Sequence, residues 1–216
     1  MLNYSPLSKE HLFDLAKFVV EENYSHHCAD NQLFNKEIDE VYLEERKLNN
    51  SQVFVSRDNN FLIVGSIRVL KWNQTDILPM QKLFNIDIRE LSQNKKCNVW
   101  HIGRFAIKKG IDKTGFNIFK TLMVCAINEV CRDKNSFALA ECDSKLLRIL
   151  KLLGFEAITL ASSIDYLGSE TIPVLLTYAG LKKFLDENIH LLPQNLAHFS
   201  IPASPLHQSV VFQATA

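Results

Sequence analysis

The amino-acid sequence predicts an α/β fold in which a mixed sheet carries helices on both of its faces. Two observations lead to this prediction. Two helical patterns and a hairpin come first, and strands then alternate with helices over the second half of the chain. In addition, residues 98–130 form an apolar strand, a loop containing glycines and then a buried helix face. We expect this stretch and the next strand to form a parallel crossover.

The first half of the chain is predicted to hold two helices and a hairpin. In chain order these are a helix capped by Ser8 and ending near Asn23, a loop over 24–35, a helix over 35–48, and strands at 52–56 and 61–71. Asp58, Asn59 and Asn60 tolerate turn geometry between the two strands, which indicates a hairpin. Residues 72–97 are irregular: Pro79 interrupts an apolar segment, and a short helix is expected over 85–94.

The second half alternates strands and helices. In chain order these are a strand over 98–107, a helix from 116 to 130, a strand over 136–141, a helix from Asp143 to Gly154, strands over 155–161 and 172–178, and a helix over 179–188. Proline cannot donate to a sheet, so Pro173 predicts that the last strand begins at an edge. We expect residues 1–188 to form a single domain and 189–216 an extended tail without regular structure.

Composition restricts the class of protein. Lysine and arginine number 24 and aspartate and glutamate also 24, a balance that argues against a dedicated nucleic-acid binder. No apolar run is long enough for a membrane span, and the N-terminus does not resemble a signal peptide. The five cysteines form no CxxC pair and are odd in number, so we expect a reduced, cytoplasmic protein. His26, His27 and Cys28 are adjacent and do not converge easily on a metal ion, so a surface loop is the preferred interpretation.

Three short motifs carry a resemblance to a known superfamily. Residues 65–70, Gly-Ser-Ile-Arg-Val-Leu, resemble its Gly-x-x-Arg-Leu-Leu strand, and residues 100–107 resemble its Glu-x-Ser-Arg-Phe strand. Residues 37–43 are similar to an acidic region that precedes the first hairpin. In this order, over roughly residues 10–180, they resemble the GNAT-type acyltransferase superfamily, above all autoinducer (acyl-homoserine-lactone) synthases and N-acyl amino acid synthases. His101 replaces the glutamate of that family, and Gly103 replaces its serine.

The resemblance implies a GNAT-like N-acyltransferase. It would move an acyl group, in the leading interpretation a fatty acyl group, from acyl-carrier protein or acyl-CoA to the amine of a small acceptor such as an amino acid. No permanently bound cofactor is expected, because the donor is a substrate. A short-chain acetyltransferase is one alternative. A module that only binds the acyl donor is the other, and the replacements at His101 and Gly103 favour it.

The loop between the predicted strand 98–107 and the following helix is the predicted donor site. In the superfamily the phosphopantetheine arm lies where two parallel strands separate, here 98–107 and 136–141. Backbone amides at a helix N-terminus attract phosphate, and amides near the strand end can stabilise an oxyanion. The lysines of this loop can equally form a solvated face. The predicted donor-binding residues are Phe105, Ala106, Ile107, Lys108, Lys109, Gly110, Lys113, Thr114, Gly115 and Phe116.

His101 and Glu141 are the predicted catalytic residues. An imidazole with an ordinary pKa near 6.5 suits proton transfer from an ammonium group at neutral pH, although His101 can equally be a hydrogen-bonded core histidine. Glu141, at the end of the next parallel strand, is the alternative base. Cys142 is an alternative nucleophile, but a cysteine at a strand end is more often a packed side chain.

Arg68, Arg104 and Glu170 are predicted to bind the acceptor. Buried arginine requires a carboxylate partner, and an amino acid acceptor would supply one for a bidentate contact. The alternative is that the arginines hold the N-terminal helices, with Glu37, Asp39 and Glu40 as the expected partners. Six phenylalanines are assigned either to the core or to an acyl tunnel: Phe84, Phe105, Phe116, Phe119, Phe137 and Phe155.

Overall fold

The central sheet is mixed, as predicted, and the computed structural model describes residues 2–27, 34–92, 97–112, 116–166 and 169–196. The strands are β1 (Asn3–Pro6), β2 (Ser51–Arg57), β3 (Ile63–Lys71), β4 (Asn98–Ile107), β5 (Ser136–Cys142), β6 (Ala157–Thr159), β7 (Ile164–Tyr166) and β8 (Ser169–Leu176). In the described ranges the strand order is β1-β2-β3-β4-β5-β8-β6, and β7 pairs with β8. Only β4 and β5 pair in parallel, which confirms the predicted crossover.

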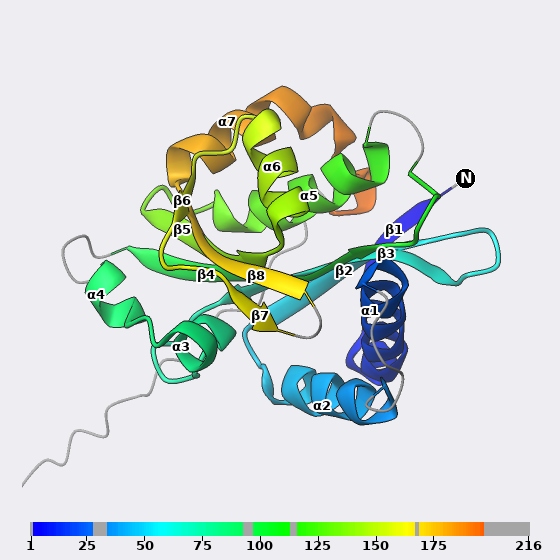
Figure 1. The fold of residues 1–216 in the computed structure, drawn as a ribbon. Helices are drawn as coiled ribbons and strands as arrows, with labels where there is room; N and C mark the ends of the chain where they lie inside the picture. The colour runs from blue at the N-terminus through cyan, green and yellow to red at the C-terminus, as the bar shows by residue number, and fades with distance from the viewer. Residues whose placement is uncertain (1, 28–33, 93–96, 113–115, 167–168, 197–216) are drawn as a thin grey trace, which may run out of the picture.

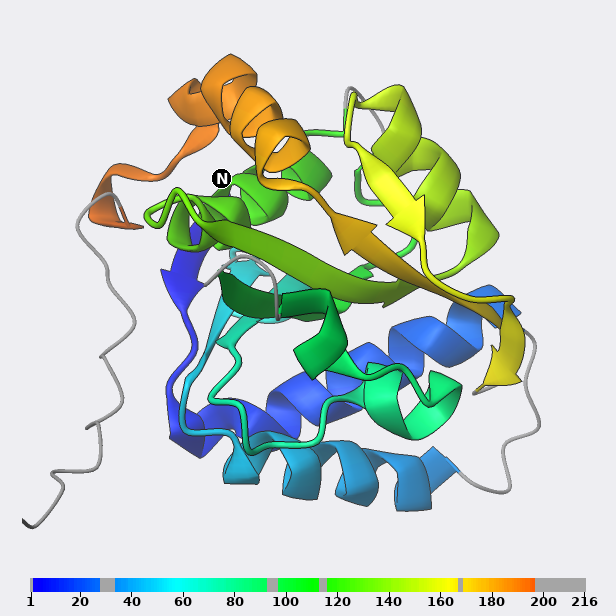
Figure 2. The ribbon, with the colours of Figure 1, turned by 90° about the vertical axis from the view of Figure 1, so that its left-hand side faces the viewer.

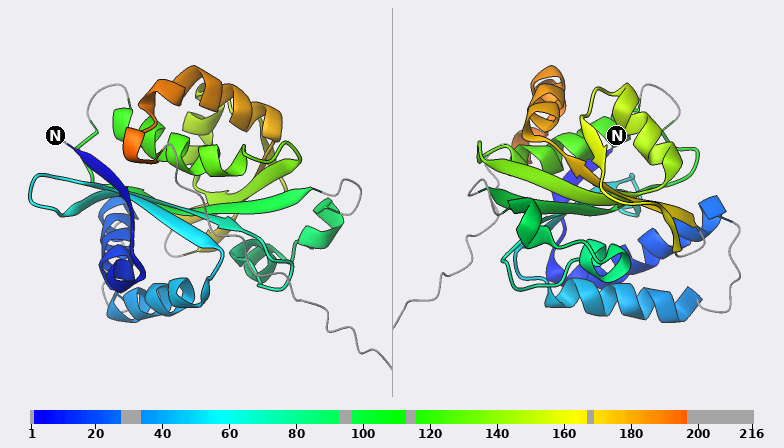
Figure 3. Two further views of the ribbon diagram at one scale, coloured as in Figure 1. Left: turned by 180° about the vertical axis from the view of Figure 1, so that it is seen from behind. Right: turned by 60° about the vertical axis from the view of Figure 1, so that its left-hand side comes forward.

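Helices cover both faces of the sheet (Figure 1). They are α1 (Leu12–His27), α2 (Phe34–Lys47), α3 (Pro79–Phe84), α4 (Ile88–Ser92), α5 (Asn117–Val130), α6 (Ser144–Leu152) and α7 (Tyr178–Asn188). Helices α5, α6 and α7 lie on one face and α1 to α4 on the other, an arrangement also seen from behind (Figure 3). Short 3-10 turns are η1 (Lys9–His11), η3 (Ile189–Leu191) and η4 (Gln194–Leu196).

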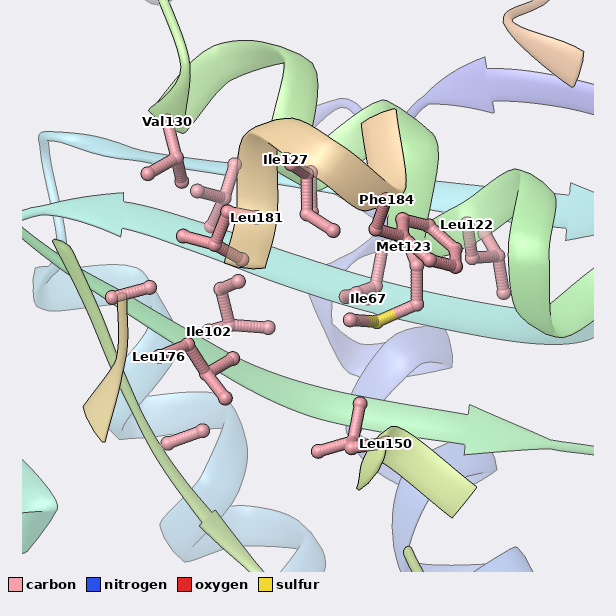
Figure 4. Close-up of a cluster of buried hydrophobic side chains, with 14 of the residues drawn as sticks. Ile67, Ile102, Leu122, Met123, Ile127, Val130, Leu150, Leu176, Leu181 and Phe184 are labelled. Carbon is pink, nitrogen blue, oxygen red and sulfur yellow. The ribbon is translucent and has the colours of Figure 1, made fainter. Parts of the chain in front are cut away.

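The main core lies between the sheet and α5. This helix is apolar on nearly all sides, as expected for a helix that packs against both a sheet and another helix. Figure 4 shows Leu122 and Ile127 of α5 among side chains of the sheet and of α7. Both residues are fully buried. Side chains of β4 alternate between the two faces, so Ile102 joins this core and His101 faces the α1–α4 side.

The sequence predicts several element boundaries incorrectly. Strands β1 and β7 are too short to show an alternating pattern, and α1 continues to His27 because its later turns pack against α2. Pro79 begins α3 as its first residue, where the missing N–H is no loss. Within the described part of the predicted tail, Ile189–Leu191 and Gln194–Leu196 form 3-10 turns, and Leu196 is buried in the main core. Residues 197–216 lie outside the described residues.

Pro173 lies inside the sheet and not at an edge. It is paired with Glu141 of β5, and β8 runs between β5 and β6. The carbonyl of Pro173 accepts a hydrogen bond from the Leu160 N–H at 3.0 Å, just beyond the last residue of β6. In an extended strand the nitrogen of a residue points to the same side as its carbonyl, so the missing N–H removes no bond to β5.

A test of the α7 boundary follows from its N-cap. The Thr177 hydroxyl accepts from the Gly180 N–H at 3.2 Å and donates to Glu156 at 2.6 Å. We expect Thr177→Ala to lower the free energy of unfolding by about 1–2 kcal/mol in urea titrations, since caps contribute about that much. Thr177→Ser retains the hydroxyl and should restore most of the difference. Equal losses in both variants would show that the hydroxyl is not the stabilising group.

In the described ranges no helix combines the length and the apolar composition that crossing a membrane requires.

Candidate active site

Strands β4 and β5 separate after four paired residues. Their register runs from Asn98 opposite Ser136 to His101 opposite Leu139 and no further, although β4 continues to Ile107 and β5 to Cys142. The sequence predicts this separation from the resemblance alone. Beyond His101 the two strands therefore do not pair with each other through their backbones. We call this separation in the middle of the sheet the gap.

A histidine–glutamate pair connects β4 and β5 where their pairing ends. His101 Nε2 lies 2.8 Å from Glu141 Oε2, and the ring is 1% exposed. Burial alone would raise the pKa of the Glu141 carboxyl, but the contact with His101 and the charge of Arg68 outweigh it and hold this pKa below its ordinary value. The other oxygen, Glu141 Oε1, is buried and has no hydrogen-bond partner among the described residues. The two residues that the sequence predicts as catalytic are thus in direct contact.

The pair belongs to a longer chain of contacts on the α1–α4 face of the sheet. Arg68 Nη2 lies 3.0 Å from His101 Nδ1, and Arg68 Nε lies 3.4 Å from Glu45 Oε1. Arg104 continues the chain, with Nε at 2.8 Å from Glu45 Oε1 and Nη2 at 2.8 Å from Glu44 Oε2. We call this sequence of contacts the buried polar chain: Glu44, Arg104, Glu45, Arg68, His101 and Glu141.

Opposite charges determine the ionisation of the residues in this chain. Burial would raise the pKa of Glu45, but the guanidinium groups of Arg68 and Arg104 outweigh burial and lower it. Burial lowers the pKa of Arg68, and Glu45 opposes that change. For Arg104 the two glutamates of α2 prevail over burial and raise the pKa. Glu45 is consequently a carboxylate that compensates two buried guanidinium groups.

The arginine partners differ from those predicted. Glu44 and Glu45 contact Arg104, not Glu37, Asp39 or Glu40, because the last turns of α2 lie over β3 and β4. A signal in the sequence could have indicated Glu45. It follows Ile38 and Val41 at the spacing of one helix face, so an acidic residue occupies an apolar position, and all three residues are buried. Both arginines thus contact α2, the second of the N-terminal helices, and acceptor binding stays a prediction.

A β-bulge distorts β4 beside the gap. Gly103 is opposite Arg68 and Ala106 is opposite Ser66, so Arg104 and Phe105 together face a single residue of β3. Arg104 has a φ of 51°, unusual for a side chain of this size, and its carbonyl accepts from the Ser66 hydroxyl at 2.8 Å. A bulge leaves its extra residue out of the ladder, which agrees with the predicted oxyanion role of amides near Phe105 without testing it.

The predicted phosphate loop is partly occupied by the protein's own groups. The Lys108 N–H donates to Val64 O and the Lys109 N–H to the Glu22 carboxylate, both at 2.9 Å. The Phe119 N–H in the first turn of α5 donates to Asp112 Oδ2 at 3.0 Å. Lys113, Thr114 and Gly115 lie outside the described residues. The Glu22 carboxylate therefore binds one amide that the sequence assigns to phosphate, that of Lys109, whereas Asp112 binds an amide of α5 outside that assignment. Donor binding by Gly110 and Phe116 stays a prediction.

Comparison with known proteins places the fold. No protein-family model matches the sequence, and no curated protein does. Among solved structures, the N-acyl amino acid synthase FeeM from uncultured soil microbes superposes with a TM-score of 0.59 at 12% identity, covering 85% of this chain and 95% of that one. An acyl-CoA N-acyltransferase from Pseudomonas aeruginosa gives 0.52 at 13%, covering 82% and 100%. The chain has the GNAT fold.

A third structure with this fold is the CoA-dependent acyl-homoserine lactone synthase BjaI, with a TM-score of 0.51 at 15% identity, covering 89% of this chain and 91% of that one. At these identities the likeness shows the GNAT fold and no more. It confirms the fold that the three motifs predict, and it does not assign roles to residues.

The remaining candidates are less supported. Burial raises the pKa of the Cys142 thiol to about 12, so it stays protonated at neutral pH and is a poor nucleophile. Glu170 is exposed on β8 opposite Asp165, and the β7–β8 hairpin extends toward the α1–α2 side of the GNAT fold (Figure 2). Tyr166 on this hairpin lies within electrostatic range of Glu44 and Arg104, a neighbour that the sequence does not predict.

The six phenylalanines do not share one tunnel. Phe105, Phe116 and Phe119 stack edge to face at the start of α5, and Phe155 packs on Phe184 of α7. Phe84 and Phe137 belong to a cluster on the opposite face of the GNAT sheet. Among the described residues no group of three or more histidine, cysteine, aspartate or glutamate side chains could hold a metal ion.

Two cavities lie away from the buried polar chain. One of about 380 Å³ is lined by residues of α5, α6 and α7, including Lys120 and Lys183. The other, of about 350 Å³, is lined by the segment from Trp72 to Arg89. Neither includes His101, Glu141 or the described loop residues in its lining.

Proposed function

We propose that the protein is an N-acyltransferase, which moves an acyl group from a phosphopantetheine thioester to the amine of a small acceptor. The observation that carries the proposal is the His101–Glu141 pair at the mouth of the gap between β4 and β5. Beyond His101 the two strands are not paired with each other, so an acyl donor would bind strand amides there, and the pair adds a proton acceptor beside it. The GNAT fold supports this reaction class by analogy, since its solved members named above transfer acyl groups.

The two faces of the sheet suit the two substrates. The donor would enter from the α5 side, with its phosphates near residues 108–116 and its thioester in the gap. The acceptor would approach from the α1–α4 side, where Glu141 and the buried polar chain lie. The amine nitrogen attacks the thioester carbon, the C–S bond breaks, and the thiolate leaves. Glu141 Oε1 accepts the amine proton and can pass it to the departing thiolate.

The finer proposal concerns the substrates. FeeM is an N-acyl amino acid synthase, and the BjaI structure holds isopentyl-CoA. By analogy we infer a fatty acyl donor, carried by acyl-carrier protein or CoA, and an amino acid or its derivative as the acceptor. The cationic Arg68 and Arg104 lie beside Glu141 on the acceptor side and suit a carboxylate, although both already contact Glu45.

Mass spectrometry tests the proposal directly. The purified chain is incubated with acyl-CoA and acyl-carrier protein of several chain lengths and a mixture of amino acids. We expect N-acyl products and release of free thiol. Thioesters that remain unconsumed at all chain lengths, with every acceptor, would refute the proposal.

A second candidate function is a module that binds an acyl donor without turnover. The specific observation in its favour is that His101 and Gly103 stand where the family that the sequence resembles has glutamate and serine. Calorimetry with the thioester distinguishes the two. Binding heat without product formation favours the module, whereas product formation favours the transferase.

The donor loop gives a prediction for one residue. Asp112 places a negative charge on the first turn of α5, where a phosphate would also bind. We expect Asp112→Asn, which keeps an oxygen for the Phe119 N–H, to tighten CoA binding about two- to fivefold, the range expected for one charge at a helix terminus. Isothermal titration with CoA measures it. Unchanged or weaker binding would place the diphosphate elsewhere.

A further inference from the structure

The contact between Arg68 and His101 determines where the histidine carries its proton. Arg68 Nη2 lies 3.0 Å from His101 Nδ1. Guanidinium nitrogens only donate hydrogen bonds, so Nδ1 must be the unprotonated acceptor. The proton of the neutral ring is then on Nε2, which lies 2.8 Å from Glu141 Oε2 and donates to it. His101 has no lone pair left for an incoming amine.

Gly103 supplies the space for this contact. It is opposite Arg68 in the β3–β4 register, and a Cβ atom at this position would lie 2.8 Å from Arg68 Nη2 and 3.1 Å from His101 Cε1. The guanidinium nitrogen is the atom that would have to move. Because Arg68 is 2% exposed and also held by Glu45, its movement would break the contact with His101.

The charges around the ring agree with a neutral histidine. Arg68 and Arg104 are cationic, and Glu45 and Glu141 are anionic, so these four buried or half-buried groups balance without a charge on His101. Glu44 adds a partly exposed carboxylate that contacts Arg104 from α2. Arg68 Nε and Nη1, Glu45 Oε2 and Glu141 Oε1 are buried without hydrogen-bond partners among the described residues, so the chain retains donor and acceptor capacity.

We propose that Arg68 is a positioning residue that holds His101 as the Nε2–H tautomer, and that Gly103 permits this contact. Glu141, oriented by the histidine, is then the group that accepts the amine proton. This last step rests on the proposed function, whereas the tautomer does not. His101 and Gly103, the two residues that depart from the motif of the family that the sequence resembles, are thus both needed for the contact with Arg68.

Nuclear magnetic resonance of the full chain labelled with ¹⁵N-histidine tests the tautomer. The chain has seven histidines, and the signals lost in His101→Gln identify His101. At pH 7 we expect a protonated Nε2 and an unprotonated, hydrogen-bonded Nδ1. A proton on Nδ1 in the wild type would overturn the proposal.

Variants separate the contact from general packing. Gly103→Ala retains both Arg68 and His101, but its added methyl group should push the two side chains apart. Arg68→Lys keeps the positive charge but lacks the forked guanidinium donor. Both should shift the Nδ1 signal and mix the tautomers, with folding checked by circular dichroism. The matched control is Gly65→Ala, where a Cβ would crowd Leu122 at 3.0 Å, away from His101. An Nδ1 signal that stays unchanged in Gly103→Ala or in Arg68→Lys would also overturn the proposal.

Kinetics distinguishes this inference from the proposed function. If the transferase activity is present, both variants should lower kcat on the order of 10²-fold with the KM for the donor unchanged, as for a misplaced catalytic group. If the variants show the expected NMR shifts but the wild type has no transferase activity, the tautomer proposal stands and the proposed function is refuted. Activity with unresponsive NMR signals would refute this inference alone.

Discussion

Glu141→Gln should lower kcat for acyl transfer by about 10²- to 10⁴-fold, the usual contribution of a general base. Glutamine keeps an oxygen for the His101 Nε2–H, so the pair remains in place, but it cannot accept the amine proton. The measurement is thiol release from an acyl-CoA at saturating acceptor. Because the pKa of Glu141 is lowered, its carboxylate is already ionised at neutral pH, and activity losses caused by its protonation should begin only below about pH 4.3.

The control for this variant is Glu21→Gln, the same chemical change on the exposed surface of α1. It should leave kcat and the KM for the donor unchanged. Full activity in Glu141→Gln would show that another group takes the proton, and His101 would then have to exchange its partner. A higher KM with an unchanged kcat would instead assign Glu141 to acceptor binding.

Glu45→Gln should lower the free energy of unfolding by about 3–5 kcal/mol at pH 7, because it leaves the buried guanidinium of Arg68 without its carboxylate and removes one of the two carboxylates that contact Arg104. The folded-state pKa of Glu45 is lowered, so its contribution is fully present above the unfolded value of about 4.3. It is lost as the pH falls through the folded pKa. Urea titrations at pH 7 and at pH 3 should therefore show a difference between variant and wild type that shrinks at the lower pH.

Glu44→Gln is the matched control. Glu44 also contacts Arg104, but its side chain is 48% exposed, and exposed ion pairs contribute only about 0–1 kcal/mol. Equal losses in the two variants would indicate that burial of the carboxylate is not decisive. A Glu45→Gln difference independent of pH would show that packing, and not charge, accounts for its effect.

The sequence predicts the parts of this fold that have strong local signals. The parallel crossover follows from the apolar strand over 98–107 and the buried helix face after it, and Asp143 accepts the Leu146 N–H as an N-cap should. Short strands such as β7 carry too few residues for a period. The position of Pro173 could not be inferred, because the pairing of β8 between β5 and β6 depends on contacts distant in sequence.

The candidate site is predictable in its members but not in their connections. His101 and Glu141 follow from their places on two parallel strands, and the structure places them in contact. Glu45 is harder to infer, since an acidic residue in an apolar helix position has meaning only once its guanidinium partners are known. The binding of the Lys109 amide by Glu22 and of the Phe119 amide by Asp112 depends on the path of α1 and of the loop, which no local pattern specifies.

The close approach at Gly103 constrains how this chain can change over generations. A larger residue there displaces Arg68, and a carboxylate in place of His101 would meet Glu141 directly across the strands. Neither replacement relieves the conflict that the other creates, so each should be poorly tolerated. A library that randomises position 103 alone should therefore return mostly glycine among its folded variants.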